Sequence, residues 1–244
     1  MHQPLFLSVN NFTGAEITIQ LRRVVGFVSK YSEVAVSVDS LKVEIPKEAV
    51  AAYDRAMDSA RRGELKKVVT DLEKAVKLAP DYYDALLELG LRYHKDGKNA
   101  DAARVMKHAL EVNPASMKAR AVLGQQAFEA DDFQKAADLL GQAVQLGNMT
   151  PNVFLMLGVA NFKLERLEVA EFGLLRALDV APGLGLANLA LHNVHLSRYR
   201  VSHDRKDLDK ALVQLDTYLA KHPTADDFAK VQAAADKIRK ALQQ

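Results

Sequence analysis

Proline residues recur at a fixed interval along most of this chain. Pro46, Pro80 and Pro114 lie 34 residues apart, the next step falls on Asn148, and the step after that reaches Pro182. A period of this length is typical of proteins built from stacked repeats, each of which forms the same supersecondary unit. No other feature of the sequence constrains the fold as strongly.

Small and turn-forming residues keep the same period, and each has a physical reason to recur. A small residue is needed where two helices cross closely, a glycine or polar residue lets the chain reverse, and proline fits beyond a helix end. The recurring small residues are Gly90, Gly124 and Gly158, then Ala102, Ala136 and Ala170, and the turn positions are Gly63, Gly97, Asp131 and Glu165. The pattern predicts two antiparallel helices in each repeat.

The segment Tyr83–Pro114 resembles a tetratricopeptide repeat, with its Leu-Gly, Tyr, Ala, Ala and Pro positions occupied. The resemblance implies an all-α, right-handed superhelical solenoid of five helix pairs, over residues 49–82, 83–116, 117–150, 151–184 and 185–225. An amphipathic segment at 226–242 is the expected capping helix. The departures from the pattern are His192, Tyr218, Asn148 and a seven-residue insertion in the fifth repeat, for which we expect a polar loop at Val201–Asp207.

In this family partner peptides lie along the concave wall formed by the first helix of each pair, which implies a set of groove residues here. Members that bind acidic chaperone tails carry Lys and Asn at positions where this chain has apolar residues, so such a clamp is not expected. The alternative for the leucines is packing between neighbouring first helices. The matching groove positions are Tyr53, Met57, Leu87, Leu91, His94, Lys95, Gln125, Phe128, Glu129, Leu155, Val159, Phe162, Lys163, Leu189 and Asn193.

Residues 1–45 differ from the repeat domain, which we place at 46–244. Apolar residues alternate with polar ones around Leu7, Ile19 and Val36, a pattern typical of half-buried strands, and Asn10–Ala15 is a plausible turn. The segment that begins at Val34 and runs into the first repeat resembles bacterial envelope proteins in which a carboxypeptidase-regulatory-like β-sandwich precedes the repeats. That resemblance implies that residues 1–45 are the remnant of a β domain of a longer exported protein.

Composition excludes several classes of function. The 33 basic and 31 acidic residues nearly balance, which does not favour nucleic acid, and the absence of cysteine excludes disulfides and thiolate metal sites. The sequence shows no signal peptide and no membrane span, so the chain as it stands is expected in the cytoplasm. A periplasmic or envelope location is the alternative if the chain is part of a longer exported protein.

No pattern of catalytic residues stands out. His192 and His195 share a helix face and could chelate a metal, but both occupy packing positions of the fifth repeat and no third ligand has helical spacing to them. We therefore expect no enzyme activity, no cofactor and no metal. The expected function is a scaffold that binds a partner protein in its concave groove. The alternative is a self-association module of an envelope protein, with the groove filled by the N-terminal segment or by a second copy.

Overall fold

The computed structural model describes residues 5–10, 16–21 and 44–243. The chain divides into two compact units, Met1–Glu44 and Ile45–Gln244, and each is described by itself. In the first unit, strands β1 (Leu5–Asn10) and β2 (Glu16–Leu21) pair antiparallel, with Leu7 opposite Ile19. The two strands predicted from alternation are confirmed. Residues 11–15 of the expected turn, the third strand around Val36 and residues 34–43 of the segment that resembles envelope proteins lie outside the described residues.

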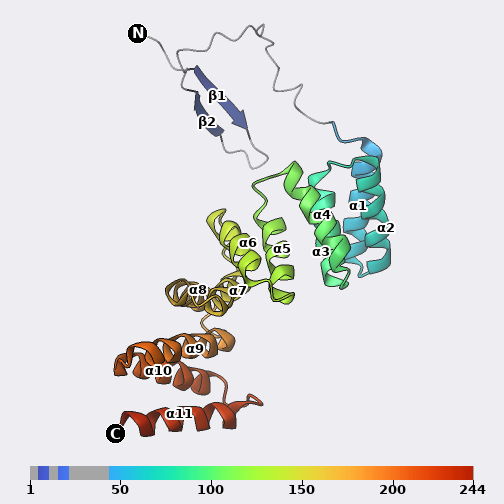
Figure 1. The fold of residues 1–244 in the computed structure, drawn as a ribbon. Helices are drawn as coiled ribbons and strands as arrows, with labels where there is room; N and C mark the ends of the chain where they lie inside the picture. The colour runs from blue at the N-terminus through green and yellow to red at the C-terminus, as the bar shows by residue number, and fades with distance from the viewer. Residues whose placement is uncertain (1–4, 11–15, 22–43, 244) are drawn as a thin grey trace, which may run out of the picture. The chain divides into compact units, whose positions relative to one another are not determined.

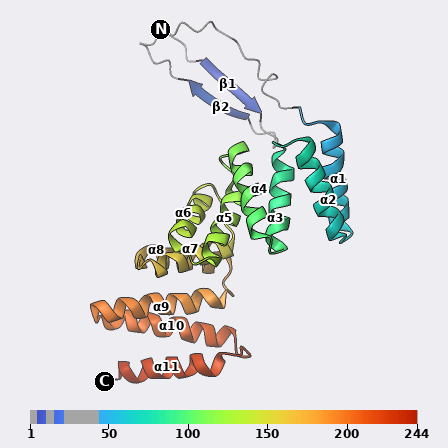
Figure 2. The same cartoon turned by 45° about the vertical axis from the view of Figure 1, so that its right-hand side comes forward.

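The second unit is built from helix pairs that follow one another in chain order (Figures 1 and 2). Each pair packs mainly within itself and then against the next pair, as a solenoid requires. The predicted all-α solenoid is confirmed. The pairs are α1 (Lys47–Arg61) with α2 (Leu65–Leu78), α3 (Tyr83–Lys95) with α4 (Asn99–Val112), α5 (Met117–Glu129) with α6 (Phe133–Gln145), α7 (Pro151–Lys163) with α8 (Leu167–Val180), and α9 (Gly185–Ser202) with α10 (Arg205–Lys221), followed by α11 (Phe228–Leu242).

The chain reverses within the first four pairs through one residue in the left-handed conformation. Gly63 and Gly97 have φ of 74° and 72°, and Asp131 and Glu165 have φ of 58° at the corresponding positions. Glycine adopts this conformation without steric cost, whereas the Cβ of other residues makes it unfavourable. The third and fourth turns are therefore intrinsically more strained than the first two, and pair packing must hold them in place.

The helices of a pair cross at the glycine positions predicted from the sequence. A Cβ on Gly158 of α7 would lie 2.6 Å from Leu174 Cγ and 3.0 Å from the Leu174 backbone nitrogen on α8. A Cβ on Gly124 would lie 2.8 Å from Leu140 Cγ, and both leucines are fully buried. Because glycine lacks that carbon, each leucine fits directly against the backbone of the first helix.

The predicted polar loop at Val201–Asp207 is wrong. Helix α9 continues to Ser202, only His203 and Asp204 lie between the helices, and α10 begins at Arg205. The Asp204 carboxylate accepts a hydrogen bond of 2.9 Å from the Lys206 backbone nitrogen and caps α10. The inserted residues lengthen the two helices to 18 and 17 residues, against 13 and 14 in the preceding pair.

We predict that Gly158→Ala destabilises the protein by about 1–3 kcal/mol, because the buried Leu174 has little room to move. Gly90→Ala should cost less, since its Cβ would meet mainly the flexible end of Met106. Urea unfolding followed by circular dichroism measures both.

Gly141→Ala is the matched control for these two variants. It lies inside α6 with open space around its Cβ, so the gain in helix propensity should stabilise the protein by about 0.5–1 kcal/mol. Equal destabilisation by all three variants would contradict the account of the close crossings.

Candidate functional site

From α3 to α9, the first helices of successive pairs contact one another, and together with α1 we treat their shared side as one surface. Helix α3 contacts α5, α5 contacts α7, and α7 contacts α9, whereas no comparable set of contacts joins the second helices of the described pairs. Since the first helices approach more closely, they form the inner, concave side of the solenoid. We call this surface the first-helix wall, and it contains all of the groove residues predicted from the sequence.

Most of the predicted groove residues are only partly accessible, and four of them are exposed. Lys95, Glu129 and Lys163 are exposed at the ends of their helices, and Asn193 is exposed in the middle of α9. The half-buried members are Tyr53, Met57, Leu91, His94, Gln125, Phe128, Leu155, Val159, Phe162 and Leu189. The wall is therefore a shallow apolar stripe bordered by charged side chains.

Leu87 differs from the other predicted groove residues, because it is only 6% exposed. It packs with Leu86 and Leu89 in the apolar cluster that joins the first pairs, so it cannot offer a surface to a partner. Leu155 and Val159 of α7 also pack partly against the cluster that contains Leu191 of α9. Packing between neighbouring first helices, the alternative weighed for the leucines, thus accounts for Leu87 and for part of the surface of the others.

An aromatic and cationic cluster marks the middle of the wall. The Phe128 ring on α5 meets the Phe133 ring edge to face, with centroids 5.7 Å apart. The Lys163 ammonium on α7 lies 6.0 Å from the Phe133 ring centroid. Arrangements of this kind stabilise by roughly 0.5–1.5 kcal/mol and hold the side chains in place. Phe128 is therefore a partly accessible aromatic with a fixed orientation, which suits a binding surface.

The N-terminal end of the wall is acidic. The Tyr53 and Tyr82 rings lie 5.2 Å apart, and Asp54, Asp84 and Glu88 surround them. Burial, followed by the charges of Glu88 and Asp84, raises the pKa of Tyr53 to about 12. Tyr53 therefore stays neutral at physiological pH and can donate a hydrogen bond, and the negative charge around it contrasts with Lys95 and Lys163 further along.

The most exposed large apolar side chains are Val201 and Leu186 of the first helix α9, at 83% and 63%, and further exposed apolar residues lie on second helices. Phe172 of α8 is 60% exposed and Val213 of α10 is 56% exposed, with Val169 and Leu175 also exposed on α8. At the position of Phe172, helix α4 carries Arg104 and helix α6 carries Asp138, so the apolar residue is not repeated. Scattered exposed apolar residues of this kind are normal on a protein surface.

The two histidines considered as metal ligands have ordinary packing partners. His192 Nδ1 lies 3.1 Å from the Ala211 carbonyl oxygen, and His195 is buried with Nε2 3.8 Å from a Glu171 oxygen. Burial lowers the pKa of both side chains. Among residues 44–243, no group of three or more histidine, aspartate or glutamate side chains is arranged to hold a metal ion. No helix within residues 44–243 has both the length and the apolar character that are needed to cross a membrane.

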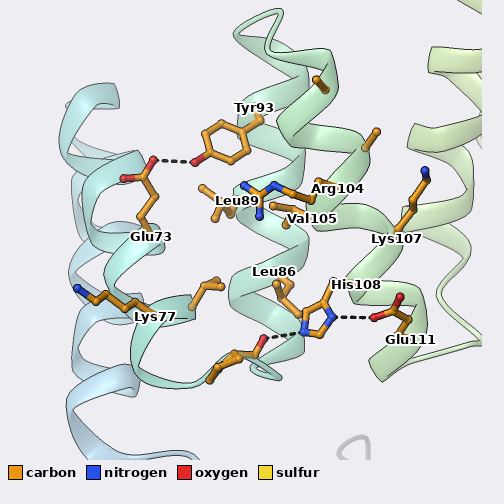
Figure 3. A pocket seen from close by; sticks show the side chains of 14 residues that line it. Glu73, Lys77, Leu86, Leu89, Tyr93, Arg104, Val105, Lys107, His108 and Glu111 are labelled. Atoms are coloured by element: carbon orange, nitrogen blue, oxygen red, sulfur yellow. Dashed lines mark hydrogen bonds and ion pairs between the residues drawn. The ribbon is translucent and has the colours of Figure 1, made fainter.

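A cleft that the sequence did not predict lies on the second-helix side. It has a volume of about 760 Å³ and lies between α2 and α4, with α3 as its floor (Figure 3). This volume is within the range of protein ligand sites, roughly 300–1,000 Å³. Its walls include Glu73, Val76, Lys77 and Pro80 on one side and Ala100, Ala103, Arg104, Lys107, His108 and Glu111 on the other, and its floor is formed by Leu86, Leu89, Tyr93 and Val105.

A hydrogen-bonded side chain fixes each end of the cleft (Figure 3). Tyr93 Oη donates a hydrogen bond to Glu73, with 2.6 Å between the oxygens. At the other end, His108 Nδ1 lies 2.9 Å from a Glu111 oxygen, and Nε2 lies 3.2 Å from the Pro80 carbonyl and 3.0 Å from Asp81. Both ring nitrogens of His108 therefore face acceptors, which only the protonated imidazolium can satisfy at the same time. Glu111 first, then Pro80 and Asp81, raise the pKa of His108.

A comparison between repeats explains why the cleft forms at this place. Where α3 carries Leu86, α5 carries Arg120 and α7 carries Phe154. Arg120 Nε donates a hydrogen bond of 2.9 Å to Gln142 on the second helix, and the Arg176 guanidinium lies 5.8 Å from the Phe154 ring centroid. Gln142 and Arg176 occupy the position of His108 in their repeats. Their side chains contact the first helix of their own pair, whereas His108 contacts Pro80 and Asp81 instead. This positional difference is the signal that sequence reasoning missed.

Five consecutive helix pairs, three of which cross at a glycine, define a tetratricopeptide-type α-solenoid. Comparison with solved structures agrees with this class. The chain is similar to the crystal structure of MamA protein, with 21% identity, a TM-score of 0.60 and coverage of 75% of this chain and 94% of the other. It is also similar to MamA from Desulfovibrio magneticus RS-1, with 16% identity, a TM-score of 0.62 and coverage of 75% and 99%.

At these identities the similarity shows the fold alone. No protein-family model matches the sequence, and comparison with curated proteins gives no match.

We predict that His108→Gln lowers stability more at acid than at alkaline pH. The raised pKa of His108 means that its contribution is fully present below its ordinary value of 6.5 and is lost as pH rises through the folded-state pKa. Free energies of unfolding in urea, measured between about pH 5.5 and pH 8.5, give the difference between wild type and variant.

Glu111→Gln is the control for this prediction. Because it removes the main cause of the raised pKa of His108, the effect of His108→Gln on the free energy of unfolding should vary less with pH in this background. The fold should be unaltered. Parallel stability profiles for wild type and His108→Gln across the range would show that folding does not raise the pKa of His108.

Proposed function

We propose that the chain is a non-catalytic scaffold that binds a peptide or helix of a partner protein along the first-helix wall. The observation that carries the proposal is the wall itself, where first helices contact one another from α3 to α9 and present half-buried apolar side chains with exposed charges at the border. The fold supports the same conclusion in general terms, because stacked helix pairs create extended concave binding surfaces. The proteins of similar structure are likewise tetratricopeptide-type solenoids.

The roles of the wall residues follow from their accessibility. Phe128 and Phe162 are half-buried aromatics that a partner would cover, with a contribution of about 1–3 kcal/mol each. Lys95, Glu129 and Lys163 are exposed and would set the register and the association rate. The acidic surroundings of Tyr53 and the two lysines give the wall a charge asymmetry, which favours one direction of a bound segment.

The alternative is that the wall is covered by a second copy or by residues 1–45 in an envelope protein. Sedimentation of the purified full chain distinguishes these occupants, because a wall-mediated dimer should become monomeric in the Phe128→Glu/Phe162→Glu variant. Removing residues 1–45 tests the internal occupant. If that segment fills the wall, its removal should lower the stability of the protein or cause it to aggregate. If the wall is a groove for a partner, the shortened protein should remain soluble.

We predict that Phe128→Glu/Phe162→Glu abolishes capture of the partner in a cross-linked pull-down from the source cell. The two charges would be placed on the surface that the partner must dehydrate. Lys95→Glu/Lys163→Glu, at exposed positions that spare the core, should weaken capture and increase its salt dependence. Circular dichroism checks that each variant is folded.

Phe172→Glu is the matched control, because it makes the same substitution at a more exposed phenylalanine outside the wall. It should capture the same proteins as wild type. Capture that survives in a folded wall variant but fails in Phe172→Glu would move the binding surface to the second helices.

A further inference from the structure

We propose that the cleft between α2 and α4 is a second binding site, which takes an acidic peptide segment of a partner protein with a bulky apolar side chain beside its carboxylates. The site lies on second helices and on the opposite face of α3 from the wall residues, so it is independent of the proposed function.

Charge at the rim favours an acidic ligand. Figure 3 shows Arg104 directed over the middle of the cleft, with Lys77 and Lys107 on its outer sides. Among the described residues, Lys77 and Lys107 form no ion pair, and Arg104 reaches only Asp101 at 3.3 Å, an exposed pair of little strength. Glu111 lies against His108, and Glu73 accepts a hydrogen bond from the neutral Tyr93 hydroxyl and keeps its negative charge. The three cations Lys77, Arg104 and Lys107 outnumber the two carboxylates Glu73 and Glu111, so the net charge of the rim is positive.

The shape favours an apolar side chain next to that charge. Ala100 and Ala103 leave space on α4, and the walls and floor are apolar through Val76, Pro80 and Leu89. An arginine at the edge of an apolar cavity can bind a carboxylate in a bidentate manner while the adjoining side chain enters the cavity. The hydrogen bonds of Tyr93 and His108 hold both ends in place, so little ordering is required on binding.

The exposed rim favours a peptide over an enclosed small molecule. Glu73, Lys77, Arg104 and Lys107 are all exposed, so a ligand that extends beyond the cleft can contact cations on both helices. Nucleic acid is disfavoured, because the whole chain has a net charge of only +2.

The test uses the full chain and a fluorescein-labelled synthetic peptide with a central Phe flanked on both sides by Asp and Glu. A second peptide has Asn and Gln in place of the acids. Fluorescence anisotropy measures affinity, and amide chemical shifts of the labelled protein locate the contact. We expect the acidic peptide to bind at least about tenfold more tightly than the neutral one and to shift residues of α2, α3 and α4.

Two variants address charge and space separately. Arg104→Asp introduces the residue that α6 carries at the matching position, Asp138, and should weaken binding about tenfold or more. Ala100→Phe fills the cleft from an exposed position and should also abolish binding without loss of stability. The control Lys135→Glu changes charge at an exposed position of α6 and should leave affinity unchanged.

The outcomes separate this site from the first-helix wall. Binding that is lost in the cleft variants and retained in Phe128→Glu/Phe162→Glu supports the second site, whatever the fate of the wall. The proposed second site is overturned if the acidic peptide does not bind or if the neutral peptide binds equally well. It is also overturned if the chemical-shift changes are confined to wall residues such as Leu91 and Phe162. Retention of affinity in folded Arg104→Asp would do the same.

Discussion

The close crossing of the two helices in each pair is the contact on which the other features depend. Leu140 and Leu174 lie against the backbone at Gly124 and Gly158, in space that a Cβ would occupy. This contact fixes the distance and angle within a pair, and thereby the face that each pair presents to the next. Because three successive pairs repeat it with a glycine, the first helices meet along the wall and the second helices diverge enough to leave room for the α2–α4 cleft.

The fifth pair keeps this architecture by different means. His192 stands where the earlier pairs have glycine, and its ring contacts the Ala211 carbonyl of α10. The insertion adds about one turn to each of α9 and α10, and a turn is 3.6 residues, so the buried faces stay in register. A polar segment was expected to form a loop there. It forms helix because an extension by whole turns preserves the contacts between the two helices, and Asp204 caps the second helix.

Local pattern was sufficient for the helices, the turns and the two described strands, but not for accessibility. The positions of the glycines and prolines depend only on sequence neighbours within one pair, so the period revealed them. How much of Leu87, Leu155 or Phe162 remains exposed depends on how closely α3, α5, α7 and α9 approach one another, and no single repeat contains that information. The cleft was missed for a related reason. It depends on Leu86 being shorter than Arg120 and Phe154, and on His108 turning towards Pro80 and Asp81 across the pair boundary.

Helix α3 contributes to both surfaces, and its geometry keeps them apart. Leu86, Leu89 and Tyr93 are spaced three and four residues apart and line the cleft, while Leu91 and Lys95 repeat four residues apart on the wall. The two sets lie on different faces of one helix, so a substitution in one set leaves the side chains of the other in place. The two proposed sites would let one molecule hold two partner segments at once. A solenoid whose inner and outer surfaces are formed by different helix faces allows this without any movement of its core.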